Sequence, residues 1–189
     1  MLEPEILTQR LKLSPLMAGD APAVFEYRAD PAVCRFQSFE PGTLEDVERF
    51  IAGLESNVFD TPGTWFQFAM RLRASGLLVG DLGTHFMADD PRQVEIGFTV
   101  APAHQGRGYA TEAVAGILDF LLGPLRKHRV FASVDPRNAA CIAVLERVGM
   151  RQEAHFRESL WLKGEWVDDM VFGILASEWE SRSSEDVGC

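Results

Sequence analysis

One stretch near the middle of the chain decides the fold: residues 94–113, with the sequence VEIGFTVAPAHQGRGYATEA. Its first part predicts a strand over Gln93–Val100, and its last part opens an amphipathic helix over Gly108–Leu122. The free N–H groups at the N-terminus of the helix and the positive end of its dipole point into the glycine-rich loop between these two elements. We therefore expect a phosphate or pyrophosphate there, although a turn that only connects two elements is the alternative.

The segments before this stretch alternate between helix and strand signals. A first strand is predicted over Thr8–Leu16, followed by a helix from Asp20 to Ala29 and another from Thr43, where Thr43–Asp46 fits a capping box. Strands over Trp65–Arg73, Leu77–Phe86 and Gln93–Val100 follow one another through short turns. These three strands are expected to form an antiparallel meander.

The segments after it complete a mixed sheet. We expect a short buried strand over Val130–Val134, a helix capped by Asn138 and ended by Gly149, and closing strands over Met150–Arg157 and Val167–Leu175. The strand–helix–strand order after Gln93 implies one parallel crossover. The predicted fold class is α/β (α+β), with a mostly antiparallel sheet, a single domain over residues 1–180 and a flexible tail over 181–189.

Composition excludes several classes of protein. The 189 residues carry a formal net charge of -10 and only one short basic cluster, Arg126–Arg129, so we expect no nucleic-acid partner. No apolar run is long enough to span a bilayer and the first residues lack a basic signal region, which predicts a cytoplasmic protein without a membrane partner. The spacing of three cysteines and four histidines predicts neither a disulfide framework nor a metal site.

The glycine loop only superficially matches a dinucleotide-binding fingerprint. Counting G-x-G-x-x-G from Gly106 places Thr111 at the third glycine, and the next strand ends at Asp135, later than the fingerprint requires. An oxidoreductase of that type is therefore a distant alternative, which an NAD(H) titration would test.

The stretch Gln105–Ala110 matches the [QR]-x-x-G-x-[GA] signature of the GNAT acetyltransferases, and the chain resembles that family over almost its whole length. The segment Leu7–Leu11 resembles the opening L-x-T-x-R-L strand of the RimJ/RimL-like branch. Residues 138–150 resemble its N-x-x-S-x-x-V-L-E-K-x-G-F helix, and residues 156–166 resemble its closing strand and turn. The resemblance implies the GNAT fold, with two splayed parallel strands that hold the pantetheine arm of acetyl-CoA.

The resemblance also assigns roles to residues. It implies acetyl-CoA as co-substrate, no metal, and a set of binding residues: Phe98, Thr99, Val100, Gln105, Gly106, Arg107, Gly108, Tyr109, Ala110 and Asn138. Backbone N–H groups near residues 98–100 are the expected oxyanion donors. Asn138 could instead be a plain helix cap, and Tyr109 an acid or a packing residue.

Two residues are catalytic candidates. Glu95 occupies a strand position where the family often has a general base, although a structural carboxylate is an equal alternative. Cys141 stands where many relatives have a serine proposed to protonate the leaving thiolate. A thiol with an ordinary pKa near 8.5 could do the same, and a small residue on an amphipathic helix is the alternative.

The resulting hypothesis is an N-acetyltransferase that moves an acetyl group to a primary amine by direct attack in a ternary complex. The acceptor could be a protein or peptide α-amine or a small molecule, and the segments Arg35–Gly42 and Trp161–Trp166 are expected to flank it. The alternatives are another acyl-CoA and a CoA-binding regulatory module without catalysis. The oligomeric state is left open, a homodimer included.

Overall fold

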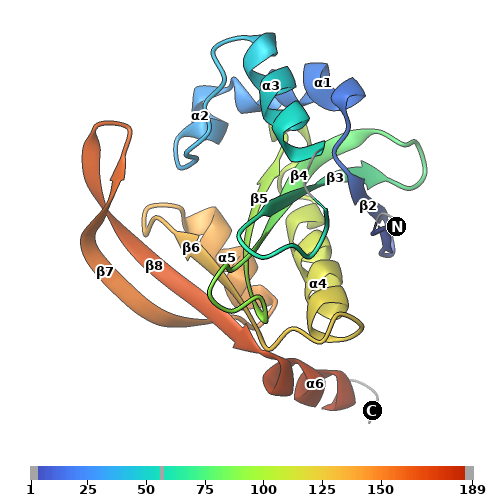
Figure 1. Ribbon diagram of the computed structural model, residues 1–189, viewed down its shortest axis with the longest axis vertical. Coiled ribbons are helices and arrows are strands. Elements are labelled where there is room, and N and C mark those ends of the chain that lie inside the picture. Colours follow the sequence, from blue (N-terminus) through green and yellow to red (C-terminus); the bar gives the residue numbers. More distant parts are fainter. Residues whose placement is uncertain (1–3, 56–57, 186–189) are drawn as a thin grey trace.

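An eight-stranded sheet forms the centre of the molecule, with its strands in the order β1-β2-β3-β4-β5-β6-β8-β7 (Figure 1). The computed structural model describes residues 4–55 and 58–185. Neighbouring strands are antiparallel except β5 and β6, which run parallel, so the predicted fold class is confirmed. The strands are β1 (Ile6–Leu7), β2 (Leu11–Pro15), β3 (Trp65–Leu72), β4 (Leu78–Phe86), β5 (Gln93–Val100), β6 (Arg129–Val134), β7 (Arg151–Leu162) and β8 (Glu165–Leu175).

Helices cover both faces of the sheet. They are α1 (Ala21–Arg28), α2 (Pro31–Cys34), α3 (Leu44–Glu55), α4 (Tyr109–Leu122), α5 (Ala139–Arg147) and α6 (Ala176–Glu185), with short 3₁₀ turns at Ala18–Asp20 and Pro102–His104. Buried residues of α1 and α3 pack with Leu16 and Ala69 on one side of the sheet. The apolar stripe of α4 packs on the other side. Two separate cores therefore enclose the central strands.

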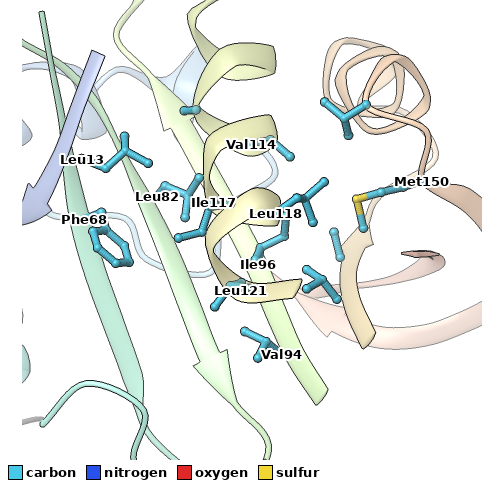
Figure 2. Packing of buried hydrophobic residues seen from close by; sticks show 14 of the residues in the cluster. Leu13, Phe68, Leu82, Val94, Ile96, Val114, Ile117, Leu118, Leu121 and Met150 are labelled. Carbon is cyan, nitrogen blue, oxygen red and sulfur yellow. The ribbon is translucent and has the colours of Figure 1, made fainter. Parts of the chain in front are cut away.

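The larger core fixes α4 against β4 and β5. Figure 2 shows Val114, Ile117, Leu118 and Leu121 of α4 facing Leu82, Val94 and Ile96, and all of them are buried. The four helical residues recur at intervals of three or four, which places them on one side of the helix. Burial of a side chain of this size contributes about 1.5–3 kcal/mol, so the start of α4 is held firmly relative to the end of β5.

The parallel pair β5–β6 separates after three residues. Gln93, Val94 and Glu95 pair with residues 129–131, whereas all of β6 pairs with β8 on its other side. Backbone groups of Ile96–Val100 that point toward β6 therefore have no partner in that strand. The two strands diverge toward their carboxyl ends, where α4 and α5 begin.

Some expectations from the sequence differ in detail from the structure. The strand predicted over Thr8–Leu16 begins only at Leu11, because a turn at residues 8–10 separates β2 from the preceding two-residue strand β1. The closing strands are longer than predicted and form a hairpin that reaches Leu162 and Glu165, drawn in orange and red in Figure 1. Part of the predicted flexible tail, up to Glu185, lies in α6, and residues 186–189 lie outside the described residues.

The predicted capping box of α3 is confirmed by reciprocal bonds. The Thr43 N–H donates to Asp46 Oδ2 at 2.9 Å and the Asp46 N–H donates to Thr43 Oγ1 at 3.3 Å. The side chain of Asp20, which directly precedes α1, does not cap this helix. It accepts from the Met17 N–H and pairs with Arg71 instead. Among the helices within residues 4–55 and 58–185, none is long and apolar enough to cross a membrane.

Candidate active site

The glycine loop after β5 has the geometry of an anion site. Gly106 and Gly108 have φ values of +72° and +79°, a conformation that side chains with a Cβ rarely adopt. The first hydrogen bond within α4 runs from the Glu112 N–H to the Gly108 carbonyl. The preceding N–H groups of Tyr109, Ala110 and Thr111 therefore point out of the helix, as at other helix N-termini that bind phosphates.

Side chains hold this loop at the end of the diverging strands. Gln105 Nε2 donates to the Val100 carbonyl at 2.9 Å and ties the loop to the last residue of β5. Asn138 caps α5, since its Oδ1 accepts from the Cys141 N–H at 3.2 Å. Because β5 and β6 are parallel, the N-termini of α4 and α5 lie at the same edge of the sheet. The predicted binding residues of the loop and Asn138 thus follow the two strands that separate.

Two buried polar atoms mark the same region. Within the described part of the chain, Thr99 Oγ1 and His104 Nδ1 are the buried side-chain atoms that lack a hydrogen-bond partner. Thr99 lies on the diverging part of β5, and His104 lies one residue before the loop. Buried polar groups without a partner are rare in folded proteins, and a bound ligand is one reason for them. The residues present therefore fit a polar ligand that lies along β5 and ends at the loop.

The flanking residues of β5 have a structural role. The side chains of Phe98 and Val100 are partly buried and pack against the larger core. They fix the strand, so that its backbone rather than its side chains is presented toward β6. Tyr109 packs against the same core, and the guanidinium of Arg10 lies 4.7 Å from its ring centroid.

Glu95 lies on the opposite face of β5, where the two strands are still paired. Its cross-strand neighbours are His85 on β4 and Phe131 on β6. His85 Nδ1 lies 3.5 Å from Glu95 Oε2, and the His85 ring stacks on Trp65 with the centroids 4.8 Å apart. The Glu95 side chain is 25% exposed. A carboxylate that is partly accessible beside an imidazole can accept a proton and pass it on.

Cys141 is the third residue after the cap of α5 and is partly buried against the larger core. Burial raises the pKa of its thiol to about 12. The thiol is therefore protonated at neutral pH, and the thiolate that a covalent mechanism needs is scarce.

The two segments predicted to flank the acceptor meet in the structure. Lys163 in the β7–β8 turn donates to the Cys34 carbonyl at 2.7 Å, and its Nζ lies 2.5 Å from Glu40 Oε2. Trp161 and Trp166 pack on each other with ring centroids 5.3 Å apart, and they are 58% and 59% exposed. The indoles therefore belong to the surface of the hairpin and not to the core.

Residues around the site that sequence reasoning did not single out are Arg10, Glu112, His85 and Trp65. His85 and Glu95 are neighbours only because of the β4–β5 register. Side chains of directly paired residues lie on the same face of a sheet. Knowledge of the β4–β5 turn would therefore have been enough to place His85 beside the Glu95 carboxylate. Among the described residues, no group of three or more His, Cys, Asp or Glu side chains could hold a metal ion.

Comparison with known proteins defines the class. The sequence model of the acetyltransferase (GNAT) domain matches residues 10–151. An uncharacterized N-acetyltransferase of Bacillus subtilis, YnaD, is 30% identical over 174 residues, which are 92% of this chain and 98% of that protein. A spermidine N(1)-acetyltransferase of Vibrio cholerae is 29% identical over 92 residues, 49% of this chain and 53% of that protein.

Solved structures agree with this result. Mycobacterium smegmatis RimJ in complex with CoA-disulfide superposes with a TM-score of 0.82 at 26% identity, covering 93% of this chain and 89% of the other. The splayed strands, the glycine loop and these relatives together define the acetyltransferase fold, and the RimJ neighbour of this fold was solved with CoA-disulfide bound. The chain belongs to the GNAT acetyltransferase family and is an N-acetyltransferase.

Proposed function

We propose that this enzyme transfers the acetyl group of acetyl-CoA to a primary amine by direct attack in a ternary complex. The amine nitrogen bonds to the carbonyl carbon of the thioester, the carbon–sulfur bond breaks, and a proton leaves the amine while the thiolate gains one. The observation that supports this most is the glycine loop at the end of the diverging pair β5–β6, beside the unpartnered Thr99 and His104 atoms. Holding both reactants there would supply much of the rate.

The proposed binding residues act mainly through backbone. The N–H groups at the start of α4 and the glycines at 106 and 108 receive the pyrophosphate, and Arg107 adds an exposed positive charge. The backbone of Phe98, Thr99 and Val100 pairs with the pantetheine arm and supplies the oxyanion donor. Asn138 combines its role as the cap of α5 with a hydrogen bond to the same arm.

Glu95 is the proposed general base. It lies where β5 and β6 begin to diverge, on the face opposite α4, and an amine that enters from this face reaches it directly or through water. An ordinary lysine-type ammonium has a pKa of about 10.4, so removal of its proton at neutral pH needs such a base. His85 lies beside Glu95 and can take the proton onward to solvent.

Cys141 is proposed as a hydrogen-bonding helper and not as an acyl carrier. Complete proton transfer from a thiol of pKa about 12 to a CoA thiolate near 8.5 would cost roughly 5 kcal/mol. The raised pKa thus weakens the expectation that this thiol is an efficient acid. It leaves a protonated S–H group that can donate a weak hydrogen bond to the leaving sulfur.

The proposed acceptor is a primary amine, either a protein or peptide α-amine or a small molecule. The name of the spermidine N(1)-acetyltransferase relative supports a polyamine as one member of the panel to test. We also propose that residues 1–180 form one N-acetyltransferase domain, which the single sheet from Ile6 to Leu175 supports. The segments around Glu40 and Lys163 would form the wall that selects the acceptor.

An acceptor screen that follows release of free thiol tests the proposal, with peptides, polyamines and aminoglycosides as acceptors. We expect turnover that depends on one class of amine. Binding of acetyl-CoA without thiol release for any amine would favour the alternative, a CoA-binding module without catalysis. Absence of acetyl-CoA binding in calorimetry would contradict the proposed site itself.

A further inference from the structure

The turn between β1 and β2 lies directly on the first turn of α4, although about a hundred residues separate them in sequence. Thr8 Oγ1 and the Arg10 N–H both donate to Glu112 Oε1 at 2.6 Å, and Arg10 Nε donates to Glu112 Oε2 at 2.6 Å. At Gly116, one turn further along α4, an added Cβ would lie 2.6 Å from Thr8 Cγ2. A side chain at that position would push the β1–β2 turn away from the helix.

Arg10 also reaches the glycine loop. Its Nη1 donates to the carbonyl of Arg107 at 3.0 Å, between the two glycines with positive φ. One guanidinium thus bridges the loop and the helix, and it does so while its side chain is 45% exposed. The fork of an arginine can hold a carboxylate and a carbonyl together, which a lysine does less well.

Glu112 is a problem for the proposed function unless its charge is compensated. A carboxylate in the first turn of a helix interacts favourably with the helix dipole, but it repels a second anion bound at the same helix end. Partial burial acts to raise the pKa of Glu112, yet hydrogen bonds from Thr8 and Arg10 outweigh it and lower the pKa. The carboxylate is therefore ionised, and only 14% of the side chain is exposed.

We infer that Arg10 is a positioning residue for the nucleotide end of acetyl-CoA, acting by cancelling the Glu112 charge and holding the Arg107 carbonyl. The inference rests on the proposed function of the loop. It requires no contact between Arg10 and acetyl-CoA. The β1–β2 turn is then part of the binding site, because it sets the electrostatic potential and the conformation of the loop.

Calorimetry with acetyl-CoA tests this on the full chain. Arg10→Gln should raise the dissociation constant about tenfold, as expected for loss of one charge-assisted hydrogen bond that positions a ligand site. Lys12→Gln is the matched control, because it removes the same charge two residues further along, on β2, at an exposed pair with Glu5. It should change the constant less than about twofold.

A truncated substrate separates positioning from general damage. Acetyl-pantetheine lacks the pyrophosphate and the nucleotide, so its KM should be unchanged in Arg10→Gln while the KM for acetyl-CoA rises. Equal losses with both substrates, or an unchanged dissociation constant for acetyl-CoA, would overturn the inference. If the unmodified enzyme does not bind acetyl-CoA at all, the proposed function of the loop fails, which is a different result.

The pair variant tests charge compensation directly. Arg10→Gln combined with Glu112→Gln removes both charges, and it should recover a large part of the affinity that Arg10→Gln loses. Continued weak binding in the pair variant would show that the Glu112 charge is not what Arg10 offsets. Arg10→Lys should recover less than the pair variant, because an ammonium cannot bridge the carboxylate and the Arg107 carbonyl in the same way.

Discussion

Asp81 and Arg28 form an ion pair in which both side chains are buried. Asp81 lies on β4 with 0% of its surface exposed, and Arg28 Nη2 donates to its Oδ1 at 2.5 Å. Tyr27 and Gln67 donate to the same carboxylate, also at 2.5 Å. Burial raises the pKa of Tyr27 well above its usual value, so its hydroxyl remains a donor. The carboxylate therefore accepts hydrogen bonds from three side chains at once.

Asp81→Asn keeps the shape of the side chain and removes the charge. The Arg28 guanidinium, which is 6% exposed, is then buried without a counter-charge. Removing one partner of a buried pair typically costs about 3–5 kcal/mol. The total stability of a domain is only about 5–15 kcal/mol, so the variant should lose roughly a fifth of it or more. Arg28→Met combined with Asp81→Asn should lose less than Asp81→Asn alone, because the stranded charge is gone.

Urea unfolding followed by tryptophan fluorescence and circular dichroism measures these losses. Asp90→Asn is the control, because Asp90 and Arg92 form an exposed pair on a turn and should not shift the midpoint measurably. The stabilising role of the Asp81 carboxylate would be refuted if Asp81→Asn shifted the midpoint no more than Asp90→Asn. The destabilisation by an uncompensated Arg28 charge would be refuted if the double variant of Arg28→Met and Asp81→Asn were less stable than Asp81→Asn alone.

Four further predictions concern the proposed site and Cys141. Gly108→Val forces a branched side chain to adopt a φ of +79° and should raise the dissociation constant of acetyl-CoA more than tenfold, whereas Gly76→Val, with a φ of +74° in a remote turn, should leave it unchanged in calorimetry. Glu95→Gln should lower kcat by roughly 10²–10⁴ with little change in acetyl-CoA binding, and a loss that does not shrink at high pH would exclude a role as base. Intact-mass spectrometry with acetyl-CoA and no amine should find no acetyl adduct on Cys141, because its raised pKa leaves little thiolate. The same shift predicts that its contribution to stability, present below the ordinary thiol pKa, falls as pH rises toward 12.

The parts of the fold that sequence predicted are those with strong periodicity. The boundaries of β5 and the apolar stripe of α4 follow from patterns that packing reinforces, and the capping box of α3 follows from local chemistry. The turn at residues 8–10 was missed because it contains no Gly, Pro, Asn or Asp to mark it. Only the contacts of Thr8 and Arg10 with α4 explain why the chain turns there.

The C-terminal differences have another physical origin. β7 is exposed along almost its whole length, so no alternation between a buried and a solvated face marks where it ends. α6 has a polar sequence that predicts a loose tail. The helix is held instead by local and distant contacts, since Trp179 Nε1 donates to Asp119 at 2.9 Å and the Leu175 N–H donates to Glu178 at 2.8 Å.

For the site, motif spacing predicts the loop and β5, because the residues proposed to bind there are consecutive in the sequence. It could not find the partners that come from other strands. The buried ion pair of Asp81 is signalled in part by the sequence. A carboxylate inside the apolar strand Leu78–Phe86 predicts a buried cation as its partner. Nothing in the sequence says that the cation is Arg28, since α1 reaches β4 only through tertiary packing.

The overall charge of the enzyme shapes how its loop must work. A chain with a net charge of -10 repels a polyanion at long range, so affinity for acetyl-CoA must come from groups close to the ligand. The N–H groups at the start of α4 provide fixed positive dipoles without adding any net charge. In the proposed site Arg10 cancels the one carboxylate in that first turn, and Arg147 Nη1 lies 3.4 Å from Thr111 Oγ1 in the same turn. An acidic surface and the proposed anion site can therefore coexist, because the proposed site depends on oriented backbone and on local pairing rather than on the sum of charges.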